Sequence, residues 1–152
     1  MPGYAGGHVE HPSYEEVSTG RTGHAELVDV SYDPREIGYR DLLEVFFAVH
    51  DPTTLNRQGA DVGSQYRSVI FVRSEEQEEA ARAFLAGLQP DPAWAGRRVV
   101  TAIEPMAAFH AAEDYHRDYF RRNPAQGYCR AVIAPKLQKF QKRFAGRLGL
   151  AD

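Results

Sequence analysis

Short apolar stretches alternate along this chain with amphipathic stretches, and loops rich in proline and glycine separate them. A period of two predicts strands, and a period near 3.6 predicts helices. We therefore expect a two-layer α/β (α+β) sandwich, with helices packed on a mixed sheet. The expected strands are Ala25–Tyr32, Tyr66–Val72 and "RVVTAIEP". The expected helices are Gly38–His50, one after Ser74, a helix or helical turns over residues 107–123, and one from Pro135.

The clearest helix start lies at Ser74. This serine can accept a hydrogen bond from the backbone of Gln77, and the glutamine side chain can reach back to the serine backbone. The pair Ser74 and Gln77 therefore predicts a capping box. Ala81, Leu85 and Leu88 give the helix that follows a buried side.

The composition is that of an ordinary globular protein. The 152 residues predict a single domain over residues 1–152. A formal net charge of -3 gives no general attraction to nucleic acid, and neither a membrane span nor a signal peptide is evident. The single cysteine, Cys129, cannot form an internal disulfide. We expect a cytoplasmic monomer.

Glu26 stands near the start of an expected strand, in alternation with Val28, Val30 and Tyr32. Burial on such an apolar face would raise the pKa of the carboxyl, because it disfavours the anion. A neutral carboxylic acid can donate a hydrogen bond or a proton to a ligand oxygen. The alternative is an exposed, solvated carboxylate at the edge of the strand.

The stretch "NRQGADVGSQYRS" places Arg57, Asp61, Tyr66 and Arg67 around two glycines, just before an expected buried strand. Functional residues often lie on loops that rigid strands hold in place. Tyr66 alternates with Ser68 and Ile70, so its ring could lie on the face that Glu26 uses. The alternative is a structural loop stabilised by an Asp–Arg pair.

Two further stretches carry reactive side chains. In "HAAEDYHRDYF", His110 with Glu113 and Asp114 has helical spacing and His116 follows, which allows a metal site of a hydrolase or a purely structural role. Cys129 has Arg130 beside it, and a neighbouring cation lowers the pKa of a thiol. The alternative for Cys129 is a small buried apolar residue.

Four stretches occur in order from Gly3 to about Phe140: "GYAGGHVEHPSYEEVSTGRTGHAE", "HDPTTLNRQGADVGSQYRS", "AEDYHRDYFRRNP" and "QGYCRAVIAPKL". Together they resemble the methionine sulfoxide reductase A family. The resemblance implies a ferredoxin-like plait core and reduction of methionine-S-sulfoxide, free or in oxidised proteins. It implies no bound cofactor or metal, and thioredoxin or another dithiol as the reductant.

The resemblance also implies roles for single residues. In the family, a neutral glutamate and two tyrosines hold the sulfoxide oxygen, and an aspartate supports them. By motif position these are Glu26, Tyr4, Tyr66 and Asp61.

The family's chemistry further requires thiols. A thiolate attacks the sulfoxide sulfur and becomes a sulfenic acid, and a second thiol condenses with it to a disulfide. Cys129 stands on the loop where many relatives carry this resolving cysteine. The resemblance implies that Asp114, His116 and Arg67 support the site without touching the substrate.

In the family, the attacking cysteine belongs to a "GCFWG" motif before the "GYAGG" stretch. Only Met1 and Pro2 precede that stretch here. We therefore expect an N-terminally truncated domain with weak or no activity of its own, in which "MPGYAGG" is the turn after a missing strand–helix unit. The alternative function is non-catalytic binding of methionine sulfoxide or of a protein partner.

Overall fold

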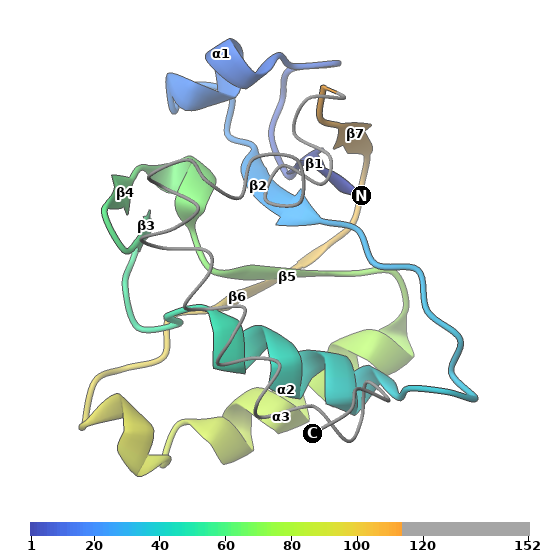
Figure 1. The fold of residues 1–152 in the computed structure, drawn as a ribbon, viewed down its shortest axis with the longest axis vertical. Coiled ribbons are helices and arrows are strands. Elements are labelled where there is room, and N and C mark those ends of the chain that lie inside the picture. The colour runs from blue at the N-terminus through green and yellow to red at the C-terminus, as the bar shows by residue number, and fades with distance from the viewer. Residues whose placement is uncertain (114–152) are drawn as a thin grey trace, which may run out of the picture. The chain divides into compact units, whose positions relative to one another are not determined.

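The computed structural model describes residues 1–113, which form one compact unit (Figure 1). Its helices are α1 (Tyr14–Ser18), α2 (Tyr39–Val49) and α3 (Glu75–Leu88), with short 3-10 helices η1 (Ser64–Tyr66) and η2 (Pro92–Trp94). Its strands are β1 (Pro2–Ala5), β2 (Ala25–Val28), β3 (Arg57–Gln58), β4 (Asp61–Val62), β5 (Val69–Val72), β6 (Ala102–Pro105) and β7 (Phe109–Ala111). Parallel and antiparallel pairs both occur, so the expected mixed α+β class is confirmed.

Strand β1 is the centre of a three-stranded antiparallel sheet with the order β2-β1-β7. Tyr4 pairs with Glu26 on one side and with His110 on the other. The expectation that "MPGYAGG" forms only a turn is therefore wrong for its first residues. Pro2 is compatible with β1 because it is the first residue of the strand.

The main apolar core lies where α2 and α3 pack on the parallel pair of β5 and β6, on the same side in Figure 1. Leu43 and Phe47 of α2 meet Ile70 and Val72 of β5, and the Phe47 and Phe84 rings stack with centroids 5.5 Å apart. Burying one such side chain contributes about 1.5–3 kcal/mol. The predicted apolar stripe of α2 therefore joins helix to sheet.

Helix α3 begins as predicted, but its capping box is incomplete. The Ser74 hydroxyl oxygen accepts a hydrogen bond from the Gln77 N–H at 3.2 Å. The Gln77 side chain instead accepts from the Arg73 N–H at 2.8 Å, one residue before the N-cap. The predicted helix start is therefore confirmed. The prediction that the Gln77 side chain bonds the Ser74 backbone is wrong.

The three expected strands are all longer than the strands that form, β2, β5 and β6. Strand β2 ends at Val28, and Val28 and Val30 are exposed, so they do not form the apolar face expected around Glu26. Strand β5 begins at Val69 and β6 at Ala102, although the expected strands start at Tyr66 and Arg98. In each case, pairing with a neighbouring strand sets the length.

The helix or helical turns expected over residues 107–123 are wrong at their start, because Phe109–Ala111 form β7. The pairing of β7 with β1 overrides the helical spacing, and the Phe109 ring lies over Gly3, where a side chain would collide.

Conversely, α1 was not predicted. Its signal was a capping box, in which the Ser13 and Glu16 side chains each accept the other residue's N–H at 3.1 Å.

Among residues 1–113, no helix has the length and apolar character needed to cross a membrane.

Replacing Gly3 by alanine tests the close packing of β1 on β7. The added methyl carbon would lie 2.4 Å from the Phe109 Cζ atom and 2.5 Å from the His110 carbonyl oxygen. Since backbone must move, we expect Gly3→Ala to lower the free energy of unfolding by about 1–3 kcal/mol in urea titrations. The matched control is Gly87→Ala in α3, where nothing lies within 4 Å of the new methyl group. Helix propensity predicts that this control gains up to about 1 kcal/mol. Unchanged stability of Gly3→Ala would contradict the packing.

Candidate functional site

Tyr4 and Glu26 are direct partners across the β1–β2 pair. Directly opposed residues of an antiparallel pair project from the same face of the sheet, with Cβ atoms about 4.5–5.5 Å apart. Tyr4 is buried, with 3% of its surface exposed, and Glu26 is half-buried. The strand pairing therefore brings together two of the predicted oxygen-binding residues.

Glu26 carries the electrostatic property expected of an acid. Burial raises its pKa above the ordinary glutamate value, and the nearby charge of Asp61 raises it further. The alternative of a fully solvated Glu26 carboxylate is therefore wrong. The burial does not come from Val28 and Val30, which are exposed. Instead β2 packs against η1.

Asp61 and Tyr66 reach the same place from a hairpin and the 3-10 helix that follows it. Gly63, whose φ of 146° is unfavourable for other residues, accepts the Tyr66 N–H at 3.0 Å and opens η1. Burial first, then the charges of Glu26, Asp61 and Tyr14, raise the pKa of Tyr66 to about 12. The Tyr66 phenol is thus a persistent hydrogen-bond donor. The expectation that Tyr66 belongs to a strand is wrong, since it ends η1.

Two residues near Tyr66 were not predicted for the site. Tyr14, at the start of α1, is close enough for its charge to affect the pKa of Tyr66. Gln65 is buried, donates to the Ser18 carbonyl oxygen at 3.3 Å, and lowers the pKa of Tyr66 through a side-chain hydrogen bond. The Ser13–Glu16 capping box could have located Tyr14 on a helix, but no sequence signal distinguished Gln65.

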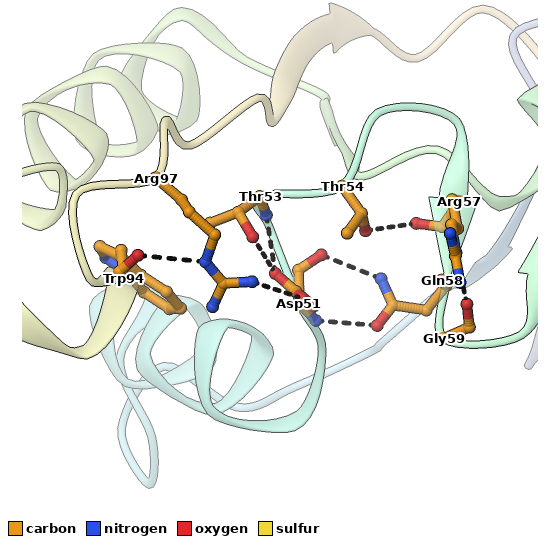
Figure 2. Close-up of polar contacts among 8 residues, drawn as sticks. All are labelled: Asp51, Thr53, Thr54, Arg57, Gln58, Gly59, Trp94 and Arg97. Carbon is orange, nitrogen blue, oxygen red and sulfur yellow. Dashed lines mark hydrogen bonds and ion pairs between the residues drawn. The ribbon is translucent and has the colours of Figure 1, made fainter.

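The two arginines of this stretch have different environments. Arg67 donates to the Ser64 carbonyl oxygen at 2.9 Å and pairs with Glu104 at 3.8 Å, so it braces η1. Arg57 is exposed and donates to the Gly59 carbonyl oxygen at 2.7 Å, at the tip of the hairpin (Figure 2). The interpretation of this loop as one stabilised by an Asp–Arg pair receives no support from these contacts.

His24 fixes the turn that follows Tyr4. Its Nδ1 atom accepts the Gly7 N–H at 3.1 Å, and its Nε2 atom lies 2.6 Å from the Val9 carbonyl oxygen. A nitrogen that accepts leaves the other ring nitrogen to donate, so these two bonds together specify the Nε2–H tautomer. These bonds connect the turn at Gly6 and Gly7, after β1, to the residue that directly precedes β2. They therefore stabilise the pairing that sets Tyr4 opposite Glu26.

The alternative of a metal site around His110 is not supported. His110 lies on β7, so the helical spacing on which the site rested is absent at this residue. The His110 ring meets the His24 and His11 rings edge-on, with centroids 5.3 and 5.4 Å away, and burial followed by these two histidines lowers its pKa. Within residues 1–113, no group of three His, Cys, Asp or Glu side chains is placed to hold a metal ion. Three of the predicted residues lie outside the described part of the chain: Asp114, His116 and Cys129.

Comparison with known proteins identifies what this arrangement resembles. A family model described as peptide methionine sulfoxide reductase matches residues 1–148. A peptide methionine sulfoxide reductase MsrA from Deinococcus radiodurans is 53% identical over 96% of this chain and 70% of its own length. One from Thermus thermophilus is 55% identical over 97% of this chain and 82% of its own length.

Solved structures agree in fold. Methionine sulfoxide reductase A of Corynebacterium diphtheriae is 37% identical, with a TM-score of 0.76 over 83% of this chain and 67% of that one. The reduced form of Mxr1 from Saccharomyces cerevisiae is 40% identical, with a TM-score of 0.75 over 84% of this chain and 72% of that one.

The proton affinity of Glu26 can be measured directly. A carbon-13 NMR titration of the side-chain carboxyl should give a pKa above the ordinary glutamate value. Asp61→Asn should lower that pKa without restoring the ordinary value, because it removes one negative charge and leaves the larger effect of burial. Asp33→Asn is the control, since Asp33 lies on an exposed loop beside Arg35. An ordinary Glu26 pKa in the unmodified chain would contradict the assignment.

Proposed function

Because this chain belongs to the peptide methionine sulfoxide reductase family, we propose that Glu26, Tyr4 and Tyr66 bind the oxygen of a methionine-S-sulfoxide. The substrate is a methionine-S-sulfoxide residue of an oxidised protein or the free amino acid. Members of this family are peptide-methionine (S)-S-oxide reductases, which are oxidoreductases that need a thiol reductant and no bound cofactor.

The observation that carries the proposal is that two hydrogen-bond donors are kept protonated at one place. Burial and the charge of Asp61 favour the neutral form of the Glu26 carboxyl. Burial and the charges of Glu26 and Asp61 favour the neutral form of the Tyr66 phenol. A sulfoxide oxygen is a strong acceptor with no proton of its own, so two neutral O–H donors complement it.

These donors also supply the chemistry. Protonation of the sulfoxide oxygen by Glu26 makes the sulfur electrophilic, and a thiolate can then attack it. The sulfenic acid that results condenses with a second thiol, and exchange with a dithiol restores the enzyme. We assign the resolving step to Cys129 and the final reduction to thioredoxin, which places the protein in a reducing compartment, the cytoplasm.

Residues around the donors are assigned positioning roles. Asp61 acts through its charge on Glu26 and Tyr66, and Arg67 holds the carbonyl at the start of η1. The motif match assigns Asp114 and His116 to the same supporting group.

Tyr66→Phe tests the binding of the sulfoxide oxygen. Loss of one hydrogen bond should weaken binding of a methionine-S-sulfoxide peptide about fivefold to tenfold in isothermal titration calorimetry. Tyr39→Phe is the matched control, since the Tyr39 hydroxyl is buried in α2 with no hydrogen-bond partner among the described residues. This control should bind as the parent chain does. Equal affinities of all three proteins would contradict the role of Tyr66.

Turnover separates a reductase from a non-catalytic binder. With dithiothreitol and a methionine-S-sulfoxide peptide, we expect at most weak methionine formation, which Cys129→Ser abolishes. Cys129 is the only cysteine of the 152-residue sequence, so here it would have to attack the sulfur itself, with dithiothreitol in place of the second thiol. Ser18→Ala is the control, since among residues 1–113 the Ser18 hydroxyl donates to the Tyr14 carbonyl oxygen of its own helix. Tight binding without turnover in the parent chain would favour the binder. Turnover that survives in Cys129→Ser would contradict thiol chemistry.

A further inference from the structure

Gln58 holds both backbone groups of Asp51 with one side-chain amide (Figure 2). The Gln58 Oε1 atom accepts the Asp51 N–H at 2.8 Å, and the Gln58 Nε2 atom donates to the Asp51 carbonyl oxygen at 3.0 Å. The two residues are half-buried and lie seven positions apart. Two bonds from one planar amide fix the orientation of the Gln58 side chain as well as its distance from the Asp51 backbone.

The Asp51 end of this clamp is itself anchored. The Asp51 carboxylate accepts the Thr53 N–H at 2.9 Å and the Thr53 hydroxyl at 2.5 Å, and it pairs with Arg97 at 3.7 Å. Arg97 also donates to the Trp94 carbonyl oxygen at 3.1 Å, as Figure 2 shows. The loop after α2 is therefore fixed to the segment after η2.

The Gln58 end belongs to the hairpin that carries Asp61. Gln58 and Asp61 are direct partners in the β3–β4 pair, which contains only one further pair, Arg57 with Val62. A hairpin of this size is not stable by itself in water. Something outside the hairpin must hold it, and the bonds from Gln58 to Asp51 connect it to the α2 side of the unit.

We infer that Gln58 is a positioning residue, whose clamp on the Asp51 backbone fixes the β3–β4 hairpin and so holds Asp61 beside Glu26 and Tyr66. The inference deepens the proposed function and rests on it for the role of Glu26. Gln58 makes no contact with the predicted oxygen-binding residues in any bond described above. Its effect on them is transmitted through Asp61.

The chain offers a matched control in Gln89. Its side chain forms the same kind of clamp on the backbone, accepting the Val99 N–H at 2.9 Å and donating to the Arg97 carbonyl oxygen at 3.2 Å. Gln89 is the C-cap of α3 and is not part of the hairpin that carries Asp61. Gln89→Ala thus removes a similar pair of bonds from the segment after η2, which reaches Asp51 through the Arg97 ion pair and has no bond to the hairpin described above.

Amide hydrogen exchange in the 152-residue chain tests the clamp. Gln58→Ala should speed exchange of the Asp51 amide about threefold to tenfold, since it loses its acceptor. The Gly63 amide, which bonds the Asn56 carbonyl oxygen at 2.8 Å across the base of the hairpin, should also exchange faster. Gln89→Ala should speed exchange at Val99 and leave Gly63 unchanged, since Gln89 has no bond to the hairpin. Unchanged exchange at Asp51 or Gly63 in Gln58→Ala would overturn the inference.

A double-mutant cycle tests transmission through Asp61. Gln58→Ala should lower the NMR-measured pKa of Glu26 in the same direction as Asp61→Asn, and it should have no further effect when Asp61→Asn is already present. Equal effects in both backgrounds would mean that Gln58 acts by another route, which overturns the inference. If the parent Glu26 has an ordinary pKa, the proposed function fails, and the exchange at Gly63 still decides the clamp.

Discussion

The antiparallel pairing of β1 with β2 is the constraint on which the site depends. It sets Tyr4 opposite Glu26, so a shift of one residue would send Glu26 to the other face of the sheet. His24 reinforces this register, because its two ring nitrogens bond Gly7 and Val9 in the turn after β1, and His24 itself directly precedes β2. The packing of η1 on β2 then adds Tyr66 to a face that strand pairing has already defined.

Local signals in the sequence predicted the elements whose formation is decided locally. Helix α2 occupies Tyr39–Val49 within the predicted Gly38–His50, and Ser74 caps α3 as its side chain required. Residues 109–111 show the opposite case. Their spacing suits a helix, yet they pair with β1, which is distant in the sequence, so long-range hydrogen bonding decided their structure.

The site was predictable in composition and less so in geometry. The family motifs predict Glu26, Asp61 and Tyr66 as site residues, and the pKa directions of Glu26 and Tyr66 suit the roles implied for them. The apolar face expected around Glu26 is wrong, because Val28 and Val30 are exposed, and η1 packs against β2 instead. Gln65 was missed because a buried glutamine inside a loop has no periodicity or spacing that marks it.

The central place of β1 also has a kinetic consequence. Its pairing with β2 closes a loop of about twenty residues, whereas its pairing with β7 joins positions about a hundred residues apart. During synthesis on the ribosome, β1 and β2 can meet early, and the second edge of β1 stays open until residues 109–111 have emerged. Contacts of such long range slow folding. The face that carries Tyr4 and Glu26 therefore takes its register early, while the sheet around it is completed among the last events.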